Sequence, residues 1–192
     1  MNDQEITQIL QDTGAIRHGH FKLTSGRHSD TYIQCARILE HPRLTTMLAS
    51  EAIRRLPDDL REQIDLVASP AVGGILWGFA VAEALNTPMI FSERKEGKMV
   101  FRRSFEVPDN ARVLVAEDVV TTGGSVKEVI DLVHGAGGVV TCVCSLIDRG
   151  ADPDFGADFF PLLRLRTPSW PADECKLCQE GIEIDSPGSR CL

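Results

Sequence analysis

Short apolar runs, each bounded by loops, constrain the fold of this chain more than any other feature. These runs occupy 64–68, 88–91, 112–116 and 139–147. Helical spacing follows the first run at 75–85 and the third at 125–135. An apolar run without alternation is typical of a strand buried on both faces, as in a parallel sheet covered by helices. The sequence therefore predicts an α/β fold with a parallel sheet of about five strands.

The regions before and after these runs carry weaker signals. Apolar residues at helical spacing predict a helix over 3–12, and Pro42 is expected to open a helix that runs to about residue 56. Between them, 20–35 has the pattern of a hairpin with a turn near Gly26. The segment from Pro168 onward is rich in Pro and Cys, and we expect an irregular appendage there.

Composition excludes several classes of protein. With 192 residues, 43% hydrophobic and 25% charged, the chain is of globular composition and needs no disulfide to hold a core. A net charge of −8 makes nucleic acid a poor partner. The longest apolar run, Gly73–Ala82, is too short to span a membrane, and the N-terminus lacks a signal-peptide pattern. We therefore expect a cytoplasmic protein with no membrane partner and with its six cysteines reduced.

The stretch that follows the third run carries the clearest chemistry. Glu117 and Asp118 come directly after the apolar residues 113–116, and the small-residue turn 121–125 (Thr-Thr-Gly-Gly-Ser) leads into a helix. Adjacent carboxylates at a strand end can accept hydrogen bonds from a diol or lie near a metal ion. The turn offers backbone N–H groups at a helix N-terminus, which favours an anion. The pattern predicts a cradle for one terminal phosphate beside a site for a sugar.

A purely structural turn is the alternative for this stretch, with Thr122 or Ser125 as the helix cap. The acidic pair directly before the turn argues against it. The turn is neither a Walker loop, which requires Gly-Lys-Ser/Thr, nor a G-x-G-x-x-G dinucleotide turn.

Positive charge is concentrated in the segment 92–105, which has five basic residues against two acidic ones in a chain of net charge −8. Such a loop suits a polyanionic small molecule, because cations stabilise the charge that a leaving pyrophosphate accumulates. It could also close over the site and exclude water. A solvated charged hairpin is the alternative.

Two further segments follow predicted strands. The loop 69–74 (Ser-Pro-Ala-Val-Gly-Gly) is built of small residues that allow a ligand to approach the backbone, although a tight turn packed by glycine is the alternative. Arg149 stands at the end of the fourth run, where a guanidinium can bind a planar carboxylate. A surface salt bridge with Asp148 or Asp152 is the alternative for Arg149.

The stretch 115–125 closely resembles the phosphoribosyl pyrophosphate (PRPP) signature of the type I phosphoribosyltransferases, and the chain as a whole resembles the orotate-specific members. Three other segments are similar to parts of that family: 21–29 to its N-terminal hood, 69–74 to its pyrophosphate loop, and 93–98 to its mobile catalytic loop. Asp148-Arg149 is similar to an Asp-Arg pair after a later strand. The resemblance implies a single phosphoribosyltransferase domain over 1–192, with a core at roughly 41–164 and a hood from roughly 1–40 and 165–192.

The resemblance implies a reaction in which orotate and PRPP give orotidine 5′-monophosphate and pyrophosphate, in pyrimidine biosynthesis. Magnesium is expected on PRPP, with no direct protein ligand. A homodimer is implied, with the loop 92–105 shared between subunits. Catalytic roles are implied for Lys98, Glu117 and Asp118. PRPP binding is implied for Arg94, Lys95, Lys98, Ala71, Val72, Gly73, Glu117, Asp118, Val119, Val120, Thr121, Thr122, Gly123, Gly124 and Ser125. Orotate binding is implied for Thr121, Arg149, Ser25, Gly26 and Arg27, with Tyr32 a further candidate.

The chain departs from the family pattern at three places. Met99 follows the second loop lysine where a histidine and a glycine-rich stretch are common, so Arg102 or Arg103 could take that role. Val72 and Gly73 replace the aromatic and lysine residues of the pyrophosphate loop, which leaves binding there to main-chain groups. Thr24 stands where many relatives have lysine.

Two other functions remain open at this point: the same transfer to a purine or to uracil, and a PRPP-binding regulator without catalysis. Cysteine and histidine leave a metal site open as well. The Cys175-x-x-Cys178 pair could bind zinc with Cys191 and one histidine, but inert thiols are the favoured interpretation because a second pair at finger spacing is missing. His18, His20 and His28 are expected to be exposed or core residues.

Overall fold

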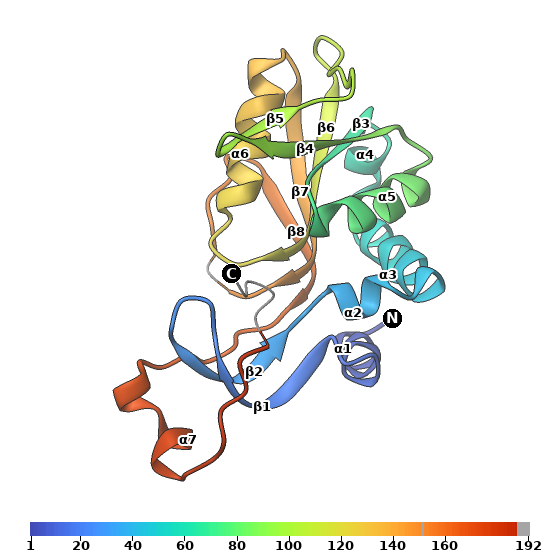
Figure 1. Ribbon diagram of the computed structural model, residues 1–192. Helices are drawn as coiled ribbons and strands as arrows, with labels where there is room; N and C mark the ends of the chain where they lie inside the picture. Colours follow the sequence, from blue (N-terminus) through green and yellow to red (C-terminus); the bar gives the residue numbers. More distant parts are fainter. Residues whose placement is uncertain (151, 188–192) are drawn as a thin grey trace. The chain divides into compact units, whose positions relative to one another are not determined.

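A computed structural model describes residues 1–150 and 152–187, which form two compact units. We call Met1 together with 39–165 the core unit. The small unit consists of 2–38 and the chain from Arg166 onward. Each unit has its own helices and strands (Figure 1).

The core unit is built on a six-stranded sheet with the order β5-β4-β3-β6-β7-β8. Its strands are β3 (Leu66–Pro70), β4 (Met89–Lys95), β5 (Lys98–Phe101), β6 (Arg112–Val120), β7 (Val139–Asp148) and β8 (Asp158–Arg164). Neighbouring strands from β4 to β8 pair in parallel, and β5 pairs antiparallel with β4 at one edge. The predicted α/β class with a parallel sheet is confirmed.

Helices flank this sheet on both faces. They are α3 (Pro42–Arg54), α4 (Asp58–Arg61), α5 (Gly73–Leu85) and α6 (Gly124–Gly135), and the short α2 (Ala36–Leu39) lies where the two units meet in sequence. In Figure 1, α6 lies on one side of the sheet, and α3 and α5 lie on the other. The proline at the first turn of α3 confirms the predicted start of that helix, because proline has no N–H to leave unpaired there.

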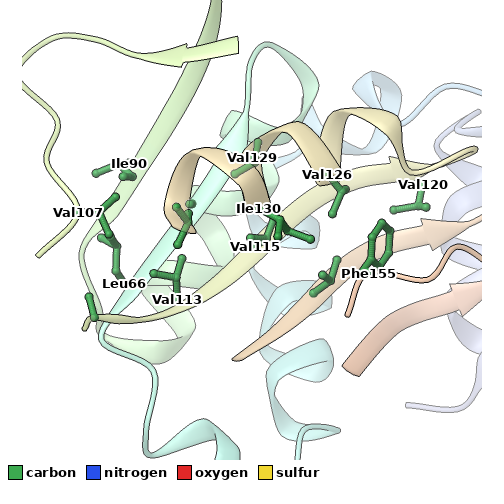
Figure 2. Packing of buried hydrophobic residues seen from close by; sticks show 14 residues of the cluster. Leu66, Ile90, Val107, Val113, Val115, Val120, Val126, Val129, Ile130 and Phe155 are labelled. Atoms are coloured by element: carbon green, nitrogen blue, oxygen red, sulfur yellow. The ribbon is translucent and has the colours of Figure 1, made fainter. Parts of the chain in front are cut away.

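Aliphatic side chains fix α6 on the sheet. Val113 and Val115 of β6 lie in one buried cluster with Val126, Val129 and Ile130 of α6 (Figure 2). Each fully buried side chain of this size contributes roughly 1.5–3 kcal/mol. The turn between β6 and α6 is therefore held at both ends by well-packed elements.

The small unit holds a helix, a hairpin and the C-terminal segment. Its elements are α1 (Asp3–Asp12), β1 (Ile16–Lys22), β2 (His28–Ile33), a 3₁₀ turn η1 (Ala172–Glu174) and α7 (Lys176–Gln179). A capping box between Asn2 and Glu5 starts α1. β1 and β2 pair antiparallel, as predicted. The C-terminal segment pairs with the hairpin through bridges between Phe21 and Asp185 and between His28 and Trp170.

The structure differs from the sequence-based expectation in three elements. The segment 92–105 is largely a regular hairpin of β4 and β5, with its tip at Glu96 and Gly97, where a loop was expected. β6 extends to Val120 and therefore includes the acidic pair. β8 was not predicted, because Pro161 interrupts its pattern; proline is tolerated there because β8 is an edge strand.

Candidate phosphoribosyl site

Four strands of the core unit end at one edge of the sheet, and the predicted site segments follow them. Pro70 at the end of β3 pairs with Ser92 of β4, and Val120 at the end of β6 pairs with Asp148 of β7. The next residues are tied together as well, since the Arg149 N–H donates to the Val120 carbonyl at 2.9 Å. In parallel sheets this edge is where ligands bind.

The acidic pair lies at the centre of this edge. Glu117 is buried, with 8% of its surface exposed, and its Oε1 accepts a hydrogen bond from the Asp118 N–H at 3.1 Å. Burial, and to a lesser extent the neighbouring Asp118 charge, raise the pKa of Glu117 well above its usual range. Burial also raises the pKa of Asp118. The pair therefore binds a proton more readily than exposed carboxyls, and it gains from any cation or hydroxyl donor that reaches it.

The loop 69–74 and the start of α5 pack directly against this pair. A Cβ on Gly73 would lie 2.7 Å from the Asp118 Oδ2, and one on Gly74 would lie 3.0 Å from the Glu117 Oε1. Glycine is therefore required at both positions, because a larger residue would collide with the carboxylate oxygens of Glu117 and Asp118. The preceding peptide bond, between Ala71 and Val72, is cis, and the Val72 side chain is 82% exposed.

The turn 121–125 forms an open hollow above the N-terminus of α6. Its lining is made by Glu117, Val119, Val120, Thr121, Thr122, Gly123, Gly124, Ser125 and Val126. Gly123 has φ 79°, and a Cβ there would lie 2.8 Å from the Phe155 ring. No side chain caps α6, so the assignment of Thr122 or Ser125 as the helix cap is wrong. The backbone N–H groups of the first turn remain available for an anion.

Cations of the β4–β5 hairpin divide into two groups. Arg94 pairs with Glu128 of α6 at 2.6 Å, and Arg103 pairs with Glu93 at 2.9 Å. Lys95 and Lys98 form the last pair of the ladder at the hairpin tip, and both are exposed. Arg94 and Arg103 are thus engaged with carboxylates of the protein, while the two lysines are exposed to solvent.

Arg149 follows β7 directly, and burial lowers its pKa. Asp148 is fully buried; its Oδ2 lies 3.1 Å from the Arg164 Nε, and its Oδ1 accepts from the Gly150 N–H at 2.8 Å. Asp148 is therefore a buried carboxylate of β7 that pairs with the half-exposed Arg164 of β8.

The remaining predicted residues, Ser25, Gly26, Arg27 and Tyr32, belong to the small unit. Gly26 has φ 80° in the hairpin turn. The Arg27 guanidinium donates to the Ser169 Oγ at 3.0 Å, and the Tyr32 hydroxyl donates to the Pro187 carbonyl at 3.2 Å. These contacts attach the C-terminal segment to the hairpin.

Sequence reasoning missed two residues that shape the site. Phe155 packs against Gly123, and Glu128 pairs with Arg94 across 34 positions of sequence. Glu128 lies three residues after Ser125 in α6, about one helical turn away. This spacing is the only local signal that could have placed Glu128 near the site. Nothing in the sequence around Phe155 distinguishes it from an ordinary loop residue.

Comparison with known proteins agrees with this geometry. The family described as "Phosphoribosyl transferase domain" matches residues 35–156, so the chain belongs to the phosphoribosyltransferase family. The orotate phosphoribosyltransferase of Heliobacterium modesticaldum is 46% identical, with 99% of this chain and 100% of that protein aligned. The Thermotoga maritima protein of the same name is 45% identical over 97% of this chain and 99% of its own length. Within the family, the chain groups with the orotate phosphoribosyltransferases.

Solved structures show the same fold. The crystal structure of orotate phosphoribosyltransferase from Aeropyrum pernix has a TM-score of 0.72 at 26% identity, covering 84% of this chain and 94% of that one. An adenine phosphoribosyltransferase from Rhodothermus marinus has a TM-score of 0.65 at 21% identity, covering 85% of this chain and all of that one, and shows the fold alone. Among the described residues, no helix is both long and apolar enough to cross a membrane.

Replacing Gly123 tests the turn. Gly123→Ala is expected to lower the free energy of unfolding by about 1–3 kcal/mol, because alanine is strained at positive φ and its Cβ meets Phe155. The matched variant Gly124→Ala, whose nearest contact would be 3.8 Å away, is expected to change stability by no more than about 1 kcal/mol. Urea unfolding of both variants measures the difference, and equal stabilities would contradict the packing described.

The acidic pair predicts a pH dependence of stability. Because the pKa of Glu117 is higher in the folded chain than in the unfolded one, ionising it costs stability as pH rises above about 4.3. Glu117→Gln removes this cost and keeps the oxygen that accepts the Asp118 N–H. The melting temperature of this variant, relative to the unsubstituted chain, is expected to rise more at about pH 8 than at about pH 4.

The exposed Glu62→Gln is the control for this comparison, and we expect a small change that is equal at both pH values. A Glu117→Gln difference that stays constant with pH would contradict the elevated pKa.

Proposed function

We propose that this chain transfers the 5-phosphoribosyl group of PRPP to orotate, giving orotidine 5′-monophosphate and pyrophosphate. The observation that carries the proposal is the juxtaposition of a buried acidic pair, an uncapped helix N-terminus and a glycine-lined loop at one sheet edge. The identity of 46% over the full length to a protein named orotate phosphoribosyltransferase supports the choice of base.

The 5′-phosphate of PRPP would bind at the turn 121–125. The partial positive charge of the α6 N-terminus and its unsatisfied N–H groups suit a terminal phosphate. The ribose hydroxyls would then donate to Glu117 and Asp118, whose ionised forms gain from such donors. Diphosphate would lie over the loop 71–73, where main-chain groups replace the side chains that the family commonly has.

Chemistry would occur at the anomeric carbon of the ribose. The orotate nitrogen forms a bond to that carbon as the bond to the diphosphate oxygen breaks, and pyrophosphate leaves with the electron pair. Lys98, assisted by Lys95, would move over the leaving group and stabilise its growing charge. For Arg94 to do the same, its ion pair with Glu128 must open, so the paired arrangement describes a resting hairpin.

Magnesium fits this site as an ion carried by PRPP, because it prefers hard oxygen donors and the substrate's own oxygens supply most of them. Glu117 and Asp118 would hold the ribose hydroxyls beside it and would not be its direct ligands. When bound, it neutralises charge on the diphosphate. The reaction is proposed to take place in the cytoplasm.

Arg149 would hold the planar carboxylate of orotate, together with Thr121. Desolvation strengthens such a guanidinium–carboxylate contact, and the lowered pKa of Arg149 reflects that environment. Ser25, Gly26 and Arg27 of the small unit are proposed as further orotate-binding residues, as the family resemblance implies. A base without a carboxylate would not make this contact with Arg149, which favours orotate over uracil or a purine.

Loss of orotate absorbance, measured with and without PRPP and Mg²⁺, tests the function. Turnover is expected only when both are present, and uracil, adenine and hypoxanthine are expected to release no pyrophosphate. Lys98→Ala should lower kcat by about 10²-fold or more, because its charge acts in the transition state. The exposed Lys127→Ala on α6 is the matched control and should keep kcat within about twofold.

Turnover with another base would replace orotate as substrate. PRPP binding without turnover of any base would favour the regulator instead. An unchanged kcat in Lys98→Ala would remove the lysine from the mechanism.

A homodimer with a shared hairpin is the remaining part of the proposal. The exposed tip carrying Lys95 and Lys98 is consistent with action on a neighbouring subunit. Co-expression of Lys98→Ala with Glu117→Gln/Asp118→Asn, followed by purification of the mixed dimer, should restore about half of the activity of the unsubstituted dimer. That level arises because one of two sites regains both parts. Mixed dimers as inactive as either parent would contradict a shared site.

A further inference from the structure

Four metal-ligating side chains meet in the small unit, and none of them has a role in the site proposed above. His20 belongs to β1, and His28 is the first residue of β2. Cys175 is the N-cap of α7, and Cys178 lies within that helix. One ligand atom from each lies within 4.8 Å of all the others. Three of the four residues are buried, and Cys178 is exposed.

The spacing of these atoms is that of a tetrahedral metal site. His20 Nε2 lies 3.1 Å from His28 Nδ1, 3.5 Å from Cys175 Sγ and 3.6 Å from Cys178 Sγ. Cys178 Sγ lies 3.3 Å from His28 Nδ1. Tetrahedral zinc, with Zn–N near 2.05 Å and Zn–S near 2.3 Å, places two nitrogens about 3.3 Å apart and nitrogen and sulfur about 3.6 Å apart. Each observed separation lies within about 0.3 Å of these values.

The second nitrogen of His20 fixes its tautomer. His20 Nδ1 lies 2.8 Å from the Ile182 carbonyl, which can only accept, so a neutral His20 carries its proton on Nδ1. Its Nε2 lone pair then points at the other three atoms. A backbone carbonyl behind the ring is the usual support of a metal-binding histidine.

The C-terminal segment is attached to the hairpin by isolated contacts. Its only regular elements between 166 and 187 are the three-residue η1 and the four-residue α7, and its backbone bridges the hairpin at Trp170 and Asp185. Cys175 lies between these two bridges in sequence and is fully buried. A metal bound there would add a cross-link between the segment and the hairpin.

We propose that His20, His28, Cys175 and Cys178 bind one structural zinc ion. Two thiolates and two imidazoles are a ligand set that zinc prefers. Four protein ligands leave no open position, so the ion has a structural role that joins the C-terminal segment to the β1–β2 hairpin. This replaces the favoured sequence interpretation of inert thiols and of histidines without a ligand role. It also takes a different ligand set from the one that included Cys191, which lies outside the described residues.

A Cys175–Cys178 disulfide and a metal-free hydrogen-bonded cluster are the two competing states. Both leave the chain without zinc, so metal content separates them from the proposal. The readouts below do not depend on transferase activity, and the zinc site therefore stands or falls apart from the proposed function.

Elemental analysis of the full chain, purified under reducing conditions, is the first test. We expect about one zinc per chain. Cys178→Ser and His28→Gln should each lower zinc retention after dialysis by more than about tenfold. Three controls should keep zinc: Cys35→Ala and His18→Gln, which lie in the same unit outside the cluster, and Glu117→Gln, which removes the acidic site as a source of bound metal.

Cobalt substitution of the unsubstituted chain is the second test, and it holds even where a variant folds poorly. Co²⁺ added to the zinc-stripped chain should give the strong thiolate-to-cobalt and tetrahedral absorption bands, saturating at about one equivalent. Zn²⁺ should abolish these bands, and Mg²⁺ should leave them unchanged. Zinc retained equally by the cluster variants, a chain with neither zinc nor cobalt bands, or a Cys175–Cys178 disulfide after anaerobic purification would each overturn the proposal.

Discussion

The burial of two adjacent carboxyls at the end of β6 is the constraint on which the rest of the site depends. Glu117 and Asp118 can be buried there because α5 starts with two glycines that leave room for their oxygens. Burial raises the pKa of both carboxyls, and the neighbouring Asp118 charge raises that of Glu117 further. A ligand that brings hydroxyl donors or a cation would lower the cost of ionising them. This is the physical basis of the sugar-phosphate site proposed above.

Positive charge is concentrated in the β4–β5 hairpin. The chain is acidic overall, yet the sheet edge near the site carries the cations of the β4–β5 hairpin. Glu93 and Glu128 neutralise two of its arginines, while the lysines at its tip remain exposed. Ion pairs between exposed side chains contribute little to stability, so these two pairs could open when a polyanion binds. A hairpin of this kind can keep a defined shape without substrate and still exchange its partners.

The sequence predicted the parts of the fold whose signals are local and periodic. The apolar runs gave the parallel strands, and Pro42 gave the start of α3. The hairpin at 92–105 was only the alternative to a mobile loop, because a run of charged residues does not distinguish the two and the pairing puts β5 at the edge of the sheet. β8 was missed for a related reason, since an edge strand tolerates the proline that a central strand would not. The turn after β6 was predicted, whereas Phe155 beneath Gly123 was not, because a tertiary contact to a loop has no periodicity.

The histidine–cysteine cluster shows where such reasoning stops. The Cys-x-x-Cys pair was visible, but its partners lie about 150 residues earlier, in a hairpin whose three histidines looked alike. The pairing of β1 with β2 brings His20 within 3.1 Å of His28, whereas His18 lies opposite Thr31. The sequence alone does not show this difference. The small unit also has the greater need of such a link: it is assembled from both ends of the chain and has only short elements in its C-terminal part. Small units bury a lower fraction of their apolar surface than large ones, and a metal supplies the missing stabilisation. The core unit has a continuous apolar cluster between β6 and α6 and does not have this need.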